Sequence, residues 1–311
     1  MGKKKSLKKK VLFICKHLPL YAMMLPGIAY LIINNYLPMA GLQLAFRKFK
    51  YNKGIWRSPF VGLDNFAFLF KSSISWEIFR NTVLYNLVFI VVGTALCIFI
   101  AILLNEIRRK RVQQCYQTII LVPHLLSWVV ISYIVYAFLG ESSGMVNNSI
   151  LKPLGIRPVA WYAEAGRWPF IIVIVYLWRI FGYNSIIYFA TIVGIDKSYY
   201  EAAVVDGATT ADQIFCITLP LLKPTIITLT LLALGRMFYS DFGLFYQVPM
   251  NSGLLFSATN TIDTYVYRGL TQLNDIGRAS AAGFLQSILG FITVLGANAL
   301  VRATEKEYSL F

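Results

Sequence analysis

The sequence predicts an all-α integral membrane protein, and three observations support this fold class. Of the 311 residues, 57% are hydrophobic and only 14% are charged, whereas soluble domains carry about 25% charged residues. Six stretches reach the roughly 20 apolar residues that a helix needs to cross a hydrocarbon core of about 30 Å. Lys and Arg are concentrated beside the first two of these stretches, as is typical where membrane helices end in the cytoplasm.

The six predicted transmembrane helices cover residues 18–42, 83–104, 117–139, 169–193, 225–247 and 281–301. Pro26 and Pro38 fall in the first helix and predict a kink or an early end, because proline cannot donate a backbone hydrogen bond. The fifth helix is expected to end near Gly243 and Pro249. The first helix follows a basic region, as a signal peptide would. It is too long for one and lacks a cleavage site, so we expect it to be retained.

The basic residues predict that both chain termini lie in the cytoplasm. Seven of the 29 Lys and Arg precede the first span, and four more form the run 108–111 in a short loop. Short loops rich in Lys and Arg remain on the cytoplasmic side. Residues 1–17 are then a basic cytoplasmic N-terminus. Residues 18–311 form a single transmembrane domain with an extracellular segment 47–82 and a cytoplasmic loop 194–224.

The net charge of +15 fits the same interpretation. Basic clusters beside apolar spans contact anionic lipid, and there is no basic face on a soluble fold of the kind that binds nucleic acid. We therefore expect a lipid bilayer, and no nucleic acid, as the partner of these charges. The four cysteines show neither a CxxC pair nor a Cys/His metal spacing, which argues against a disulfide framework and a metal site.

The chain also lacks the common catalytic motifs. It contains no G-x4-G-K-[ST] nucleotide-binding loop, no nucleophile elbow, no HExxH, no pair of carboxylates placed for acid–base chemistry, and only two histidines. We expect a protein that is not itself an enzyme and that binds no cofactor.

A stretch of the predicted cytoplasmic loop has a distinctive spacing. Residues 201–220 read EAAVVDGATTADQIFCITLP, so that Glu201, Ala202 and Ala203 precede Gly207 and a final Ile-x-Leu-Pro. The small alanines allow close approach of another helix or a groove wall. One interpretation is a helix that docks on a separate protein, and the other is an ordinary amphipathic helix on the membrane surface. The second does not require this combination of residues, which favours docking.

The same loop is predicted to form two short helices. Ser198 is the expected N-cap of a helix that begins at Tyr199, with a glutamate three residues after the cap as in a capping box. Gly207 permits a turn with positive φ. Asp206 and Asp212 flank this turn, where their carboxylates can meet basic groups on a partner.

The spacing EAA-x3-G-x9-I-x-L-P resembles the signature loop of permease subunits in binding-protein-dependent ABC importers of the maltose-transporter class. The motifs Asn35-Tyr36-x-Pro38-x-x-Gly41-Leu42 and Ser58-Pro59-Phe60-Val61-Gly62-Leu63-Asp64-Asn65-Phe66 resemble the LplB-like polysaccharide permeases. The resemblance implies the type I permease fold in a bacterial cytoplasmic membrane and oligosaccharide cargo. It also implies a second homologous permease, an extracellular solute-binding protein or lipoprotein, and two ATPase subunits that use ATP and Mg²⁺.

Polar residues inside the predicted spans mark a candidate substrate pathway, because such residues are costly in lipid and usually face a cavity. At helical spacing, Arg179 shares a face with Tyr176 and Tyr183. By the same rule, Arg236 shares a face with Tyr239 and Gly243. The full set of candidates is Tyr176, Arg179, Tyr183, Asn184, Arg236, Tyr239 and Asp241, with Trp128, Tyr188 and Tyr246 as further members.

Two interpretations of the intramembrane arginines stay open. If Arg179 and Arg236 both face the cavity, only Asp241 offsets their charge, and the cargo is an acidic oligosaccharide such as a uronate-bearing or sulfated fragment. Alternatively, both are structural and are satisfied by helix carbonyls, by Asp241 or by the partner permease.

Three rival functions also remain at this stage. The same scaffold could import a non-sugar solute, against which the N-terminal motifs argue. A secondary carrier would need ion-binding acids at the membrane midplane, where the sequence offers only Asp241. A membrane-embedded enzyme would need a catalytic pair, which the sequence lacks.

Overall fold

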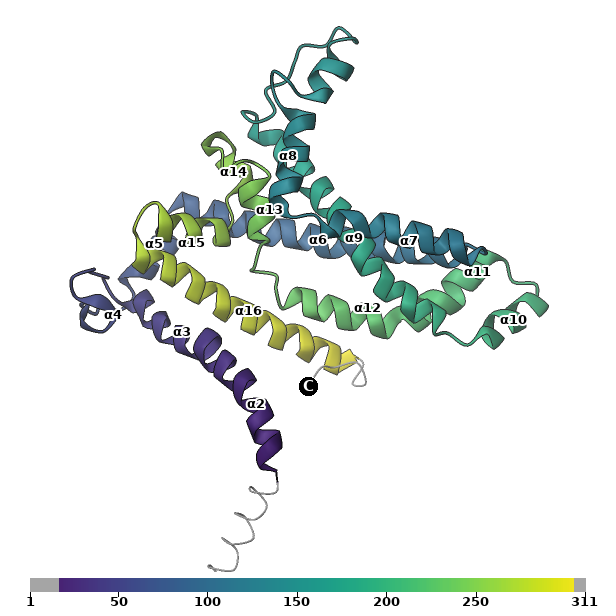
Figure 1. The fold of residues 1–311 in the computed structure, drawn as a ribbon, viewed down its shortest axis with the longest axis horizontal. Helices are drawn as coiled ribbons and strands as arrows, with labels where there is room; N and C mark the ends of the chain where they lie inside the picture. Colours follow the sequence, from purple (N-terminus) through teal and green to yellow (C-terminus); the bar gives the residue numbers. More distant parts are fainter. Residues whose placement is uncertain (1–16, 305–311) are drawn as a thin grey trace, which may run out of the picture.

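The computed structural model describes residues 17–304 and confirms the all-α membrane architecture (Figure 1). Five helical segments are long and apolar enough to cross a membrane, and a bent pair of helices brings the number to six. No strand occurs within the described residues beyond one isolated bridge between Arg47 and Phe60. The predicted basic segment 1–17 lies, apart from His17, outside the described residues.

The spans contain most of the helical elements. They are α2 (Leu18–Leu31), η1 (Ile32–Tyr36), α3 (Leu37–Met39), η2 (Ala40–Phe46), α6 (Ser73–Asn105), α7 (Lys110–Leu125), α8 (Trp128–Leu139), α9 (Trp168–Val193), η5 (Ile214–Thr218), α12 (Leu219–Leu234) and α16 (Ile276–Thr304). Shorter elements connect them: α4 (Gly54–Arg57), α5 (Asp64–Lys71), η3 (Val146–Leu151), η4 (Ala165–Arg167), α10 (Lys197–Val205), α11 (Thr210–Gln213), α13 (Phe242–Gln247), η6 (Gly253–Leu255), α14 (Phe256–Thr259) and α15 (Ile262–Thr271).

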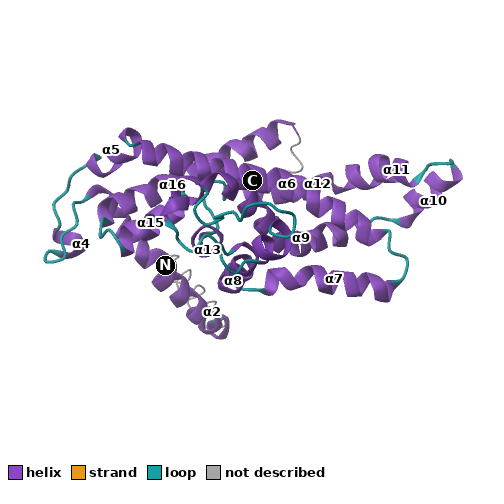
Figure 2. Cartoon of the chain, turned by 90° about the horizontal axis from the view of Figure 1, so that it is seen from above, coloured by secondary structure: helices purple, strands orange, loops and turns teal. Residues whose placement is uncertain are grey.

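The long helices run between two ends of the molecule. Figures 1 and 2 show α4 and α5 at one end and α10 and α11 at the other, with α6, α9, α12 and α16 between them. The two loops that the sequence assigns to opposite sides of a membrane therefore lie at opposite ends of the bundle.

The first span leans away from the bundle (Figure 1), and no residue of α2 is buried. Its helix passes through Pro26 without a break and ends at Phe46 rather than at residue 42. The helix widens into the π-helical η1 just before Pro38, which has no N–H to donate to the preceding turn. The predicted early end is therefore wrong, and the proline changes the helix type instead.

The second span is longer than predicted at its N-terminal side. Helix α6 begins at Ser73 rather than at residue 83, so the last third of the predicted segment 47–82 is helical. Ile78, Tyr85 and Phe89 are buried along one side of this helix. The packing of this apolar face extends the helix beyond the stretch that hydropathy alone selects.

The third span is broken, whereas hydropathy predicts one helix over 117–139. Helices α7 and α8 meet at an angle of 95°. Leu126 and Ser127 are extended, and the Ser127 hydroxyl oxygen accepts the Val130 N–H at 3.3 Å as the N-cap of α8. An apolar window cannot detect such a break, because the residues on both sides of the cap are hydrophobic.

The fifth span is also interrupted, so the predicted helix over 225–247 is wrong. The helical segment from Thr210 ends at Leu234, turns and extended backbone follow, and α13 starts at Phe242. The Asp241 carboxylate caps α13 by accepting the N–H groups of Gly243 at 3.1 Å and Leu244 at 3.5 Å. The capping aspartate therefore starts a separate short helix after the break.

The main hydrophobic core lies where α6, α8, α9 and α13 meet. Its fully buried members include Ile131, Trp168, Ile172, Leu244 and Phe245. Helix α9 also lies directly against α7, because a Cβ at Gly182 would fall 1.8 Å from the Ile120 carbonyl oxygen. This core fixes the walls of the cavity described next.

Candidate functional site

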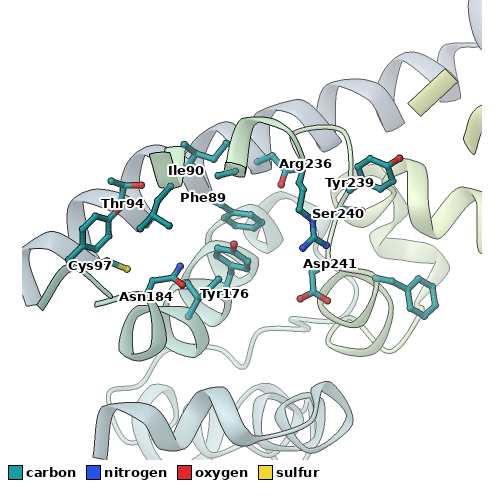
Figure 3. Close-up of a pocket in the computed structure, with 17 residues that line it drawn as sticks. Phe89, Ile90, Thr94, Cys97, Tyr176, Asn184, Arg236, Tyr239, Ser240 and Asp241 are labelled. Carbon is teal, nitrogen blue, oxygen red and sulfur yellow. The ribbon is translucent and has the colours of Figure 1, made fainter. Parts of the chain in front are cut away.

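A cavity of about 540 Å³ lies between α6, α9, α12 and the segment that joins α12 to α13 (Figure 3). This volume is within the usual range for ligand sites. Its wall combines aromatic rings with hydrogen-bonding side chains. The ring of Phe89 stacks on that of Tyr176 with a centroid distance of 3.7 Å. Asn86, Thr94 and Asn184 add polar groups.

Five of the seven pathway candidates line this cavity, and two do not. The lining candidates are Tyr176, Asn184, Arg236, Tyr239 and Asp241, and the additional candidate Tyr188 lines it as well. Trp128 and Tyr246 are not among the lining residues. The five positions fit the predicted pathway, and their contact with cargo remains a prediction.

The cavity face of α9 differs from the predicted one. Tyr176, Ile180, Asn184 and Tyr188 line the cavity at intervals of four residues, whereas the prediction grouped Tyr176 with Arg179 and Tyr183. Rows of residues spaced by four are inclined to the helix axis and form one of the ridges along which helices pack. Arg179 and Tyr183 lie outside this row and do not line the cavity.

Arg179 is held by other side chains instead of facing the cavity. Its guanidinium lies 4.3 Å from the ring centroid of Trp128, and Nη1 is 3.9 Å from Oδ2 of Asp241. Tyr183 stacks on His124 with a centroid distance of 4.4 Å. Both α9 side chains therefore contact the region where α7 bends into α8. The structure favours the structural interpretation of Arg179.

Arg236 reaches the cavity from a turn, because α12 has already ended. The predicted helical face of Arg236, Tyr239 and Gly243 is accordingly wrong. A Cβ at Gly243 would lie 2.0 Å from Cδ1 of Trp128, so this glycine packs against α8. Arg236 is exposed to the cavity and forms no ion pair with any described residue.

Several lining residues were not predicted from the sequence. Asn86 and Thr94 lie within the most apolar span, where polar side chains are costly and informative. The same rule that selected Arg179 would have found them. Ser240 also lines the cavity, because the break after α12 brings this residue to the cavity wall.

The predicted loop forms a second feature at the far end of the bundle. Helix α10 is followed by a turn at Gly207, which has φ of +81° and open space where a Cβ would lie. Glycine is therefore needed for the backbone conformation and not for space. Glu201, Ala202 and Asp206 are exposed, and Ala203 is partly buried. Val205 is 86% exposed, which leaves apolar surface available to another protein.

Two details of this loop differ from the prediction. Helix α10 starts at Lys197 with Asp196 as its N-cap, rather than at Tyr199 behind Ser198. Hydrogen bonds from the Ser198 N–H and hydroxyl hold the pKa of Asp196 below its ordinary value. The Asp212 carboxylate accepts the Thr209 N–H at 2.9 Å and hydroxyl at 2.6 Å in a capping box. Asp212 is thus engaged within α11, whereas no hydrogen bond to the Asp206 side chain occurs in this described loop.

A membrane bundle with a partly polar cavity and an exposed helix–turn–helix at one end has the architecture expected of a transport permease. The chain belongs to the family of binding-protein-dependent transport system inner membrane components, whose model matches residues 67–306. It is 32% identical to protein LplB of Bacillus subtilis (strain 168), over 93% of this chain and 90% of that protein. It is also 32% identical to the polygalacturonan/rhamnogalacturonan transport system permease protein YteP of the same organism, over 98% and 94%.

Two solved structures share the fold over nearly the whole chain. One is a bacterial ABC transporter involved in the import of the acidic polysaccharide alginate, with a TM-score of 0.87, 32% identity, and coverage of 96% of this chain and 99% of that chain. The other is a bacterial alginate ABC transporter in complex with an alginate pentasaccharide-bound periplasmic protein, with a TM-score of 0.85, 32% identity, and coverage of 94% and 97%.

These comparisons confirm the predicted family and the type I permease fold. The chain is a multi-pass component of a bacterial inner membrane transport system that depends on a binding protein.

Proposed function

We propose that this chain is the permease subunit of an ATP-driven importer that takes up an acidic oligosaccharide. Two relatives support the cargo class: one transports polygalacturonan or rhamnogalacturonan, and the other imports alginate. The observation that carries the proposal is the guanidinium of Arg236, which lines the cavity and forms no ion pair with any residue that the structure describes. It lines the same cavity as the Phe89–Tyr176 stack, where apolar faces of sugar rings can pack while hydroxyls and carboxylates take polar contacts.

The proposed complex contains a second homologous permease, two ATPase subunits that use ATP and Mg²⁺, and an extracellular solute-binding protein or lipoprotein. In this proposal the chain itself is not catalytic and binds no cofactor. Both termini and the α10–α11 end face the cytoplasm. Glu201, Ala202, Ala203, Asp206 and Gly207 then form the surface that docks on the ATPase.

The contacts of α10 support a lever that couples this surface to the cavity. The Tyr200 hydroxyl is 2.9 Å from the Thr218 hydroxyl, which ties α10 to the base of the fifth span. From Thr218 the helix continues to Leu234, and the next residues carry Arg236 into the cavity. Nucleotide-driven movement of the ATPases is transmitted along this path, so that the cavity opens alternately to the two sides of the membrane.

Arg236→Gln is expected to lower the uptake of oligogalacturonate about tenfold, because a hydrogen bond to a charged group contributes ~1.5 kcal/mol or more. Uptake of the same oligosaccharide as its uncharged methyl ester should change much less. The measurement uses the complete transporter in proteoliposomes with its binding protein, and reports each variant relative to the unmodified transporter. Selectivity of the binding protein then cancels from the comparison.

Two control variants separate charge recognition from general damage. Arg179→Gln should lower uptake of the charged and uncharged probes equally, since its guanidinium is occupied by Trp128 and Asp241. Arg167→Gln changes an exposed arginine paired with Glu164 and should leave both unchanged. Equal loss of both probes in Arg236→Gln would contradict a cargo-binding role for this arginine.

A further inference from the structure

Segment 235–241 contributes to the cavity wall and is not helical, and most of its N–H groups bond to carbonyl oxygens within the turns that follow α12. The Phe238 carbonyl oxygen and the Ser240 N–H need partners from elsewhere. Two neighbouring helices supply them. The Gln286 amide of α16 donates to the Phe238 carbonyl oxygen at 2.8 Å. The Asp263 carboxylate of α15 accepts the Ser240 N–H at 2.6 Å. Four lining residues belong to this segment: Arg236, Tyr239, Ser240 and Asp241.

Asp263 is the centre of this arrangement. Besides the Ser240 N–H, its Oδ2 accepts the Ser240 hydroxyl at 2.8 Å and the Gln286 amide at 3.1 Å. The Gln286 side chain is buried, and Asp263 forms no ion pair within the described part of the chain. A partly buried carboxylate satisfied only by neutral donors costs desolvation without gaining a counter-ion. Its place in the first turn of α15 offsets part of this cost, because the N-terminus of a helix stabilises a nearby carboxylate.

The position of this contact in the fold gives it a functional meaning. Segment 235–241 follows α12, which continues from the helices at the α10–α11 end. Asp263 and Gln286 connect the other side of the segment to α15 and α16. Asp263 is anchored in turn to α6, because the N–H of its neighbour Ile262 donates to the Thr82 hydroxyl at 3.0 Å. Movement of α12 therefore reaches the cavity through a segment that these residues hold in place.

We infer that Asp263, with Gln286, is a positioning residue for cargo translocation: it fixes segment 235–241 and thereby the orientation of Arg236 and Ser240 in the cavity. This inference rests on the proposed function for its consequence in transport. The contact itself is independent of the cargo. Neither residue lines the cavity together with Arg236, so both act through the segment that they hold.

The first test changes the polarity of the contact without changing its shape. The Gln286 amide donates to both carboxylate oxygens of Asp263, at 3.2 and 3.1 Å. Asp263→Asn removes the negative charge and replaces one of these oxygens with an NH2 group, which places two donors against each other. We expect maximal uptake of oligogalacturonate to fall about tenfold, as for loss of a hydrogen bond to a charged group. The concentration of loaded binding protein at half-maximal uptake should stay unchanged. Hydrogen exchange of the amides in 235–241 should become faster.

A second variant restores the polarity. In Asp263→Asn with Gln286→Glu, the new amide donates to the new carboxylate while the asparagine oxygen accepts the Ser240 N–H. Recovery should be partial, because the glutamate cannot donate to the Phe238 carbonyl. Gln286→Glu alone places two carboxylates together and should be impaired. The matched control is Asp275→Asn, a second aspartate beside a helix N-terminus, whose side chain bonds to Arg278 in the surface turn before α16.

Each outcome decides the inference. The inference is supported if Asp263→Asn shows slower uptake and faster hydrogen exchange in 235–241 while the amount of assembled transporter stays unchanged. The double variant should then regain part of the uptake. The inference would be overturned if uptake and hydrogen exchange in Asp263→Asn equalled those in Asp275→Asn. It would also be overturned if the double variant did not regain uptake, or if the loss of uptake matched a loss of assembled transporter. If the unmodified transporter takes up neither probe, the proposed cargo is wrong, and hydrogen exchange still tests the contact.

Discussion

Gly207→Val is expected to lower uptake about tenfold and to abolish the stimulation of ATP hydrolysis by cargo. The residue has φ of +81°, a conformation that costs an L-residue with a Cβ roughly 1–2 kcal/mol and a β-branched one more. Valine therefore shifts the turn toward other backbone conformations and misplaces α10, which carries the predicted ATPase-docking residues. The measurement compares cargo-stimulated ATP hydrolysis and uptake in the assembled transporter.

Gly155→Val is the matched control for this experiment. Gly155 has φ of +72° and, like Gly207, open space around a Cβ, but it lies in the segment between η3 and η4. The backbone strain is equivalent, while the α10–α11 loop is untouched. If cargo-stimulated ATP hydrolysis and uptake in Gly207→Val equal those of the unmodified transporter, this turn does not act as a lever. The same conclusion follows if Gly207→Val and Gly155→Val show the same defect.

Gly182→Ala is expected to have the largest effect on stability. The added Cβ would lie 1.8 Å from the carbonyl oxygen and 2.5 Å from the carbonyl carbon of Ile120. Because both are backbone atoms, α7 must move away from α9 to make room. Overpacking of this kind costs about 1–3 kcal/mol or more. The amount of assembled permease and its thermal unfolding midpoint in detergent should both fall.

The control for this variant is Gly283→Ala in α16, where no atom lies within 4 Å of the added Cβ. Alanine is also favoured over glycine within a helix by ~1 kcal/mol, so this variant should be at least as stable as the unmodified protein. An unchanged unfolding midpoint in Gly182→Ala would show that α7 and α9 do not touch in the assembled transporter.

The sequence predicted the helical class, the existence of six spans and the family for reasons that are local. A bilayer requires long apolar helices, and that requirement is visible as composition. The spacing from Glu201 to Pro220 is likewise contained in one short segment. The positive φ of Gly207 could be predicted because glycine alone adopts that conformation at low cost.

The cavity could be predicted only in part. Tyr176 and Arg236 were found because polar groups in an apolar span stand out. Arg179 and Tyr183, predicted at i+3 and i+7 from Tyr176, do not line the cavity, since the face that α9 turns to the cavity depends on its crossing with α6. Ser127 and Asp241 belong to residue types that often cap helices. Because both lie inside apolar stretches that read as continuous helices, only the structure shows that a new helix starts after each of them.

The sequence by itself thus determined that this protein crosses a membrane through helices and presents a docking loop, because bilayer thickness and local backbone preferences act on neighbouring residues. Tertiary structure alone decided where spans break and which side chains meet. Asp263 and Ser240 are brought together by the packing of α15 and α16 against the break after α12, and no pattern along the chain encodes that contact.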